Sequence, residues 1–146
     1  MTDEFRHRTR MEVRFRDVDA FGHVNNAVIT SYVEHGRIRY LGDILGLRPP
    51  GTMAMILAMI KVDYLEPIYF GQTVEIASRV DWIGRTSLSM SHLLTETESS
   101  QELARATSVL VAYDYPNSRP TPVPDEWRTT LAAHEGHDLA RPAIAS

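Results

Sequence analysis

The sequence predicts an α+β fold in which one long helix packs against an antiparallel β-sheet. A single long helical pattern covers residues 27–45, one strand-like segment precedes it, and four strand-like segments follow it. The later segments are joined by short turns, as neighbouring antiparallel strands are. One helix can cover only one face of such a sheet, so another face or edge is left for a partner. We therefore expect a homodimer or homotetramer.

Length and composition indicate one soluble domain. The chain has 146 residues, of which 43% are hydrophobic, and this suffices for a single packed core. We expect one domain over residues 1–146, with a core at about 8–132. The N-terminus lacks the apolar segment of a signal peptide, and no apolar run reaches the roughly 20 residues that span a bilayer. We expect a cytoplasmic protein with no membrane contact.

Cysteine content and net charge exclude several kinds of site. The chain contains no cysteine, so disulfides, thiolate metal sites and a cysteine nucleophile are ruled out. The formal net charge of −4 argues against nucleic-acid binding, which draws most of its affinity from basic surface. The six histidines do not form a group with ligand-like spacing, so no metal site is expected.

The first strand and the helix are predicted from two different periods. Alternation of Met11, Val13 and Phe15 with polar residues indicates a half-buried strand. Small and apolar residues then recur every three or four positions and predict a helix ending near Leu45, before Gly46 and the Pro-Pro-Gly segment at 49–51. The expected buried stripe is Ala27, Val28, Ser31, Tyr32, His35, Ile38, Gly42 and Leu45, with Ser31 and Gly42 allowing close packing.

Four further strands and a short helix are expected after the long helix. The nearly continuous apolar run from Met53 to Ile60, extended to Leu65, predicts a strand covered on both faces. Alternating patterns predict strands at about 74–82, 88–94 and 105–113, with Trp82 on the apolar side of the first of these. Residues 125–133 are expected to form a short helix, and the tail through Ser146 to be loosely ordered.

The segment at 17–26, Asp-Val-Asp-Ala-Phe-Gly-His-Val-Asn-Asn, is the most informative part of the chain. It places acidic side chains and a histidine on a glycine-containing turn directly before the predicted helix. The first N–H groups of a helix have no partner within it and can polarise a carbonyl oxygen. This combination favours acyl chemistry.

Several ordered motifs resemble those of the hot-dog-fold acyl-CoA thioesterases of the 4-hydroxybenzoyl-CoA thioesterase-like superfamily. The similarity extends over about residues 8–132, and the matching segments are 15–27, Tyr32, Glu34 and Arg37 on the helix, 64–67 with Gly71, 83–87, and 119–124. It implies a sheet wrapped around a central helix and active sites built by two subunits. It also implies hydrolysis of an acyl-CoA, with an acyl-carrier-protein thioester as the less favoured substrate, and no cofactor.

The resemblance assigns candidate catalytic residues by position. Asp19 matches the catalytic carboxylate, which acts as nucleophile or as general base for water; the alternative is a carboxylate that only caps the helix. Asn26 matches the residue whose backbone N–H binds the thioester oxygen. His23 aligns with a histidine that plant acyl-carrier-protein thioesterases use together with an asparagine. Phe21 stands at that asparagine position here, so His23 acts in catalysis or only orders the turn.

The remaining assignments concern binding. Gly22 and Val24 belong to the expected substrate-binding turn, and Arg85, Thr86 and Ser87 are candidates for coenzyme A phosphates, with an exposed turn as the alternative for Arg85. Ile29 replaces a tyrosine usual in the family. Asp17 and Glu34 are expected to be structural, and Glu34 is the next candidate if Asp19 is dispensable.

Two other functions fit the same sequence. Hot-dog hydratases and dehydratases also act on acyl thioesters, and they move a proton beside the carbonyl with a histidine and an acid. A domain of this fold can also bind acyl-CoA without catalysis, because fold does not dictate function. The sequence does not determine whether the acyl group is aromatic, short or long.

Overall fold

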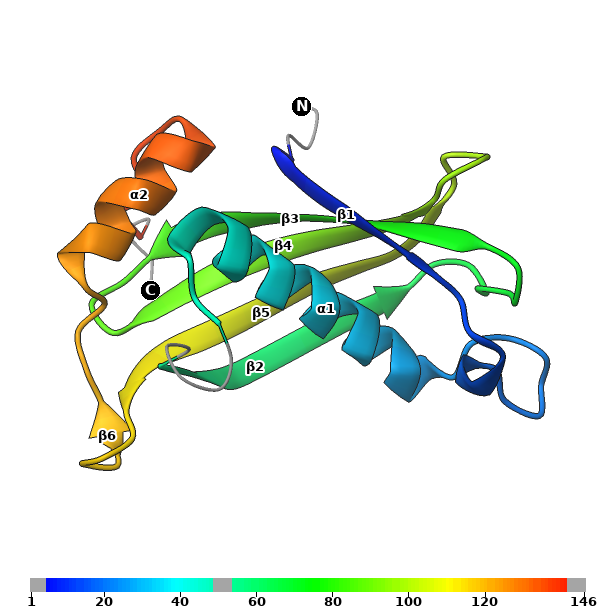
Figure 1. The fold of residues 1–146 in the computed structure, drawn as a ribbon, viewed down its shortest axis with the longest axis horizontal. Helices are drawn as coiled ribbons and strands as arrows, with labels where there is room; N and C mark the ends of the chain where they lie inside the picture. Colours follow the sequence, from blue (N-terminus) through cyan, green and yellow to red (C-terminus); the bar gives the residue numbers. More distant parts are fainter. Residues whose placement is uncertain (1–4, 49–53, 142–146) are drawn as a thin grey trace, which may run out of the picture.

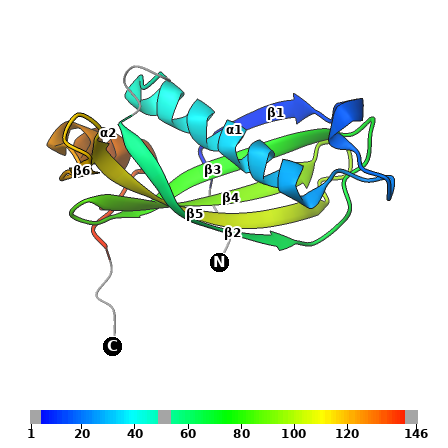
Figure 2. The same ribbon diagram turned by 90° about the horizontal axis from the view of Figure 1, so that it is seen from below.

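A long helix lies across one face of a single antiparallel sheet (Figures 1 and 2). The computed structural model describes residues 5–48 and 54–141. The strands follow the order β1-β3-β4-β5-β2, and β6 pairs with β5. This confirms the predicted α+β architecture. The elements are β1 (His7–Glu12), a 3₁₀ turn (Phe15–Asp17), α1 (Asn26–Leu45), β2 (Met55–Tyr64), β3 (Thr73–Ile83), β4 (Ser87–Glu96), β5 (Glu102–Asp114), β6 (Arg119–Pro120) and α2 (Asp125–Glu135).

Both ends of α1 follow from local sequence. The Asn25 side chain accepts a 2.8 Å hydrogen bond from the Ala27 N–H and caps the N-terminus. Gly46 ends the helix because it adopts a left-handed conformation, with φ of 71°, and donates to the Gly42 carbonyl at 3.0 Å. The predicted helix end is therefore confirmed, whereas the Pro-Pro-Gly segment at 49–51 lies outside the described residues.

The buried face of α1 differs from the predicted stripe. Ser31 is exposed, and the helix packs closely on the sheet at Gly36, where an added Cβ would overlap Ile76 Cγ2. The prediction was wrong because apolar residues occur on nearly every side of this helix, so periodicity alone does not determine which side is buried. Only Tyr32 and Gly42 of the predicted stripe are among the buried residues, which are Ile29, Tyr32, Val33, Gly36, Arg37, Tyr40, Leu41 and Gly42.

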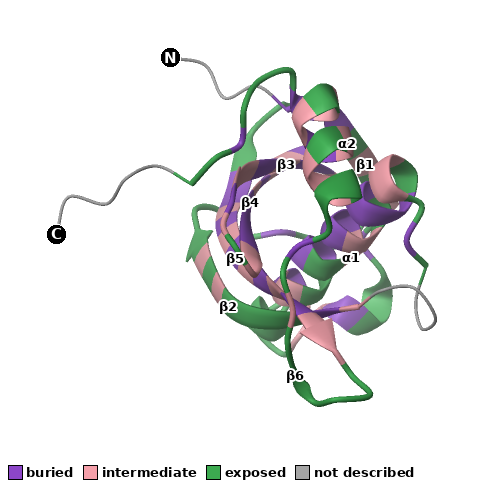
Figure 3. Cartoon of the chain, turned by 90° about the vertical axis from the view of Figure 1, so that its left-hand side faces the viewer, coloured by how far each residue is buried: buried purple, intermediate pink, exposed green. Residues whose placement is uncertain are grey.

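Alternate residues of β3, β4 and β5 form the wall of the core that faces α1 (Figure 3). The predicted alternation holds through β4 and β5. In β3 a bulge between Val80 and Trp82 shifts the register, so that Ile83 is buried and Trp82 is only partly buried. The prediction that Trp82 continues the apolar side was therefore wrong. The bulge before it reverses the alternation, and a bulge has no periodic signal in the sequence.

The first strand ends earlier than predicted. β1 stops at Glu12, and Phe15 lies in the 3₁₀ turn with 78% of its surface exposed. Its ring contacts that of Phe70 edge to face, with the centroids 5.7 Å apart. Met11 and Val13 do point to the core, so the alternation was correct up to the turn.

β2 is an exposed edge strand, although its apolar sequence predicted cover on both faces. Among the described strands it pairs only with β5, and Ile56, Leu57 and Met59 are 36%, 40% and 43% exposed (Figure 3). An apolar run that is buried in a central strand becomes exposed when the topology places it at an edge. Met53 itself lies outside the described residues.

The segment after α2 is also more ordered than predicted. Leu139 is buried and its carbonyl accepts a 2.7 Å hydrogen bond from the Ile83 N–H, so residues up to Arg141 are held against the end of β3. The loose tail was expected from the end of the short helix through Ser146, and its last residues, 142–146, lie outside the described part of the chain. Among the helices of the described ranges, neither has the length and apolarity to cross a bilayer.

Candidate active site

The loop between the 3₁₀ turn and α1 closes on itself around Asp19. The Asp19 N–H donates to the His23 carbonyl at 3.0 Å, and the Gly22 N–H donates to the Asp19 carbonyl at 3.0 Å. Gly22 has φ of 88°, a conformation that side-chain-bearing residues rarely adopt, and an added Cβ would meet no atom within 4 Å. The glycine is thus required for the shape of the turn and not for space around it.

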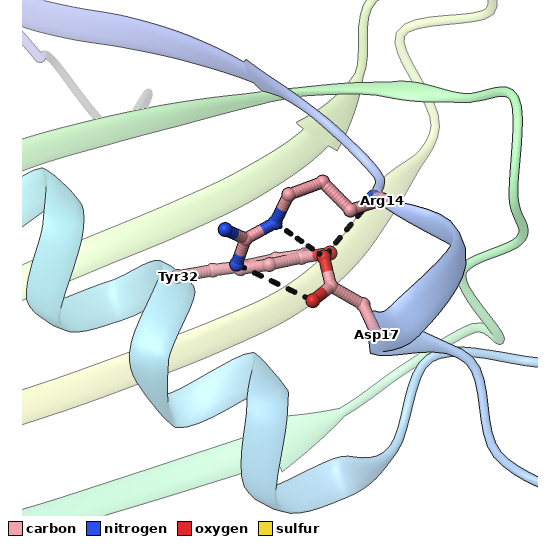
Figure 4. Close-up of polar contacts among 3 residues, drawn as sticks. All are labelled: Arg14, Asp17 and Tyr32. Carbon is pink, nitrogen blue, oxygen red and sulfur yellow. Dashed lines mark hydrogen bonds and ion pairs between the residues drawn. The ribbon is translucent and has the colours of Figure 1, made fainter.

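A buried network beneath this loop joins it to α1 (Figure 4). Tyr32 donates a 2.7 Å hydrogen bond to Asp17 Oδ2, which also accepts the Arg14 backbone N–H at 3.1 Å. The Arg14 guanidinium lies 3.3 Å from Asp17 Oδ1. Burial alone would raise the pKa of Asp17, but the hydrogen bonds from Tyr32 and Arg14 outweigh it and lower the pKa. Asp17 thus anchors the loop as a buried carboxylate.

The same network acts on Tyr32. Burial, followed by the hydrogen bond to the Asp17 carboxylate, raises the pKa of Tyr32 above its ordinary value. The phenol therefore stays protonated and keeps donating to Asp17. Because Tyr32 lies on α1, this bond fixes the position of the loop relative to the helix N-terminus.

The Asp19 carboxylate is directed by two donors. Its Oδ1 accepts the Phe21 N–H at 2.9 Å, and its Oδ2 lies 3.5 Å from Asn25 Nδ2. Asp19 is partly exposed, so it can meet both water and a bound substrate. Asn25 was not among the residues that the resemblance assigned. Its type is typical of a helix N-cap, and that signal alone could have marked it.

Asn26 begins α1 and lines the adjacent pocket. In the described part of the chain its N–H makes no hydrogen bond, as the first helical N–H usually does not. Its carbonyl accepts a 3.2 Å hydrogen bond from the Tyr64 hydroxyl at the end of β2. The pocket has a volume of about 210 Å³ and is lined by His23, Val24, Asn26, Ile29, Tyr64, Leu65, Glu66, Pro67 and Ile68.

Val24 and Ile29 form an apolar part of the pocket wall. Val24 is buried and its N–H donates to the Ile68 carbonyl at 2.7 Å, which joins the loop to the segment after β2. Ile29 is buried one turn into α1. The tyrosine usual at that position in the resembling family would bring a hydroxyl to this wall, and the isoleucine leaves it apolar.

His23 lines the pocket but is not paired with the Asp19 carboxylate. Its Nδ1 lies 3.3 Å from the Val24 carbonyl, and its ring stacks on Phe21 with centroids 6.3 Å apart. Within the described residues no hydrogen bond joins its ring to the Asp19 side chain. The structure thus brings His23 and Asn26 to one pocket and places Asp19 beside it.

The predicted phosphate-binding residues lie elsewhere in the same chain. Arg85 and Thr86 lie in the turn between β3 and β4, and Ser87 begins β4, at the end of the sheet opposite the loop that carries Asp19 (Figure 1). β3 has 11 residues, and this length separates the two ends by roughly 30 Å. Arg85 is exposed, and its carbonyl accepts the Val123 N–H at 2.9 Å. One chain therefore does not bring this turn to the Asp19 pocket.

Glu34 lies in a separate groove between α1 and β2. It is eight residues beyond Asn26, about 12 Å along the helix. Its side chain is 58% exposed and lies 3.5 Å from Arg37 Nη2. Thr30, Ser31, Leu57 and Ile60 complete the groove, which has a volume of about 180 Å³. In the ranges 5–48 and 54–141, histidine and acidic residues do not gather in a group of three or more that could hold a metal ion.

Comparisons with a family model and with solved structures both find thioesterases. Residues 13–131 match the family model of the thioesterase-like superfamily. A Thermus thermophilus thioesterase, whose structure is described as a complex with coenzyme A and zinc, is 39% identical, with a TM-score of 0.81 over 97% of this chain and 100% of that one. A predicted thioesterase from Bacillus stearothermophilus is 26% identical, with a TM-score of 0.80 over 92% and 98% of the two chains.

A curated relative has a more distant sequence. The chloroplastic acyl-acyl carrier protein thioesterase ATL3 of Arabidopsis thaliana is 24% identical over 127 residues. That alignment covers 84% of this chain and 66% of the plant protein, so the chain spans less than two thirds of its relative's length. The matched family model covers most of the chain described above, including the loop, α1 and the sheet. The chain therefore belongs to the thioesterase-like superfamily, and its sheet wrapped around a long central helix is the hot-dog fold of thioesterase structures.

Proposed function

We propose that this protein hydrolyses acyl-CoA thioesters to a free carboxylic acid and coenzyme A. The observation that carries the proposal lies at the start of α1. Among the described residues the Asn26 N–H makes no hydrogen bond, Asn26 lines a pocket, and two donors hold the Asp19 carboxylate beside it. A developing oxyanion needs such a donor, and a thioester needs little further activation because its thiolate leaves readily. Family membership and the coenzyme A complex of the Thermus relative support the same reaction.

The proposed reaction has two routes that share their residues. As general base, Asp19 removes a proton from water while the water oxygen attacks the thioester carbonyl; as nucleophile, Asp19 forms a mixed anhydride that water then hydrolyses. In both routes the Asn26 N–H stabilises the oxyanion, and the C–S bond breaks to release the coenzyme A thiolate. His23 is the second candidate for the catalytic base, because its ring lines the pocket and, among the described residues, is not bonded to Asp19.

We propose that the active unit contains more than one copy of the chain. In the part of the chain that the structure describes, no strand pairs with the outer edge of β2, and apolar side chains are exposed along it, which is a surface suited to a second sheet edge. Arg85, Thr86 and Ser87 are too far from Asp19 in one chain to share its ligand. If they bind coenzyme A phosphates at this pocket, they do so from another copy.

An acyl-carrier-protein thioester is the second candidate substrate. The Arabidopsis relative is named for that substrate, and the pocket would receive the same thioester carbonyl from either carrier. Rates with one acyl group on coenzyme A and on a carrier protein decide between the two. A faster reaction with the carrier-protein thioester would overturn the preference for coenzyme A.

Thiol release from a panel of aromatic, short-chain and long-chain acyl-CoA substrates tests the proposed function. Hydrolysis of at least one substrate is the expected result. Hydration of an enoyl-CoA without thiol release would identify a hydratase. Tight binding of an acyl-CoA without any turnover would identify a binding protein.

A further inference from the structure

We propose that Asn25 is a positioning residue that holds the Asp19 carboxylate at the N-terminus of α1. The inference rests on the proposed function, in which Asp19 and the Asn26 N–H act on the same thioester. Asn25 is the residue between the loop and the helix, and both ends of its amide side chain are used.

The orientation of the Asn25 amide follows from the cap. The Ala27 N–H can donate only to an oxygen, so the atom that caps it at 2.8 Å must be Oδ1. The NH₂ group then points the other way, and it lies 3.5 Å from Asp19 Oδ2. The side-chain orientation that caps the helix is therefore the same one that points the NH₂ group at the Asp19 carboxylate.

The Asn25 backbone is fixed as firmly as its side chain. Its N–H donates to the Asp17 carbonyl at 3.0 Å, and its carbonyl accepts the Val28 and Ile29 N–H groups at 2.9 and 3.2 Å. Asp17 is in turn held by Tyr32 on the same helix. Hydrogen bonds thus hold both the backbone and the side chain of Asn25 where its amide meets Asp19.

This support has a chemical consequence for Asp19. Its Oδ1 accepts the 2.9 Å bond from the Phe21 N–H, whereas among the described residues the Asn25 amide is the one donor near Oδ2, at 3.5 Å. Oδ2 is therefore the oxygen left for a water proton or a substrate carbon, and Asn25 directs it toward the helix start where Asn26 begins. A misplacement of about 1 Å in such a group can reduce turnover 100-fold.

Two substitutions separate capping from positioning. Serine, aspartate and asparagine cap helices about equally well, so Asn25→Ser and Asn25→Asp keep the cap. Serine removes the amide donor, and aspartate places a second carboxylate against Asp19 Oδ2. We expect melting temperatures within about 2 °C of the parent. We expect kcat to fall roughly 10-fold in Asn25→Ser and further in Asn25→Asp, with KM little changed.

The pH profile gives a readout that a purely structural role would not move. In Asn25→Asp the acid limb of kcat/KM should shift upward by about one pH unit, because like charges disfavour ionisation. The other titratable groups near this carboxylate, His23 on the loop, Asp17 beneath it and Glu66 across the pocket, are the same in both variants. The matched control is Asn117→Ser, which removes another Asn amide that donates to an aspartate, Asp114, at 2.7 Å in the turn before β6. It should leave kcat and the profile unchanged.

The experiment distinguishes this inference from the proposed function. If the parent hydrolyses acyl-CoA and both Asn25 variants match its kcat and pH profile, the positioning role is overturned while the function stands. If the parent hydrolyses nothing, the proposed function fails, and an NMR titration of the Asp19 carboxyl carbon in the parent and Asn25→Asp still decides the contact. An upward shift of its midpoint in the variant supports the contact, and identical midpoints overturn it.

Discussion

The Tyr32 hydroxyl donates a 2.7 Å hydrogen bond to the buried Asp17 carboxylate and so joins the central helix to the loop that precedes it. Tyr32 is fully buried, and Asp17 is 4% exposed. The contact matters because that loop carries Asp19 and Asn25, whose positions depend on where the loop meets the helix.

Tyr32→Phe should destabilise the protein by about 2 kcal/mol, since it removes a hydrogen bond to a buried charged group. The free energy of unfolding, measured by urea denaturation, checks this value. Tyr69→Phe, at an exposed tyrosine, is the control and should change stability by less than about 0.5 kcal/mol. Equal stabilities of Tyr32→Phe and the parent would show that the Asp17 contact contributes nothing.

Gly36→Ala should destabilise the protein by about 1–3 kcal/mol, although alanine favours helices more than glycine does. The added Cβ would overlap Ile76 Cγ2 and lie 3.2 Å from Ser78 Oγ, so the helix must move off the sheet. Ser31→Ala on the exposed side of the same helix is the control, and it should be neutral or slightly stabilising. Thermal unfolding of the two variants provides the comparison, and a Gly36→Ala protein as stable as the parent would refute the close approach.

His92 should make the fold sensitive to mild acid. It is buried between Ser78 and Ser108, whose hydroxyls lie 2.9 and 3.0 Å from its two ring nitrogens. Burial, and then the positive charge of Arg37, lower the pKa of His92 to about 3. In the unfolded chain the imidazole binds a proton near pH 6.5. The contribution of neutral His92 to the free energy of unfolding is therefore fully present above that pH and is lost as the pH falls toward 3.

Protonation linked to His92 should lower the free energy of unfolding by roughly 2 kcal/mol between pH 7 and pH 5. Urea denaturation of the parent and of His92→Gln at pH 7 and pH 5 measures it, and the variant should lose less stability on acidification. A smaller slope remains, because burial also lowers the pKa of His35. His137→Gln, at an exposed histidine, should behave as the parent does. The same acid slope in His92→Gln and the parent would contradict the assignment.

A charge on the exposed edge strand should prevent the association of copies that we propose. Met59→Lys places a cation in the apolar row of β2, where edge-to-edge pairing would have to bury it. Light scattering should give a larger mass for the parent than for this variant. Thr129→Lys, on the exposed surface of α2, carries the same charge change and should keep the parent mass. A monomeric parent would contradict the proposed association.

Local patterns predicted most of the secondary structure, and the errors arose where position depends on the whole fold. The end of α1 at Gly46 and the alternation in β4 and β5 are properties of short segments. The buried side of α1 was mistaken because Ile38 and Leu41 both suit a core in sequence, and only the sheet decides between them. The exposed edge of β2 follows from strand order, which the apolar run from residue 53 does not encode.

The site was predictable to a similar extent. The loop motif indicated Asp19, His23 and Asn26, and the structure places His23 and Asn26 on one pocket with Asp19 beside it. Their catalytic roles stay predictions. The link from Asn25 to Asp19 was missed because it is a side-chain contact six residues apart along an irregular loop. Arg85 matched a motif, yet the length of β3 separates it from the loop within one chain.

The most direct test of the account is thiol release by Asp19→Asn and by the parent, with the acyl-CoA that the parent hydrolyses fastest. The two proteins are compared at equal folding, by circular dichroism, and at equal mass, by light scattering. The account predicts that kcat/KM falls by about 100-fold or more in the variant, as expected for loss of a catalytic base or nucleophile. Equal turnover in the two proteins would contradict the central role of Asp19 and direct the search to Glu34.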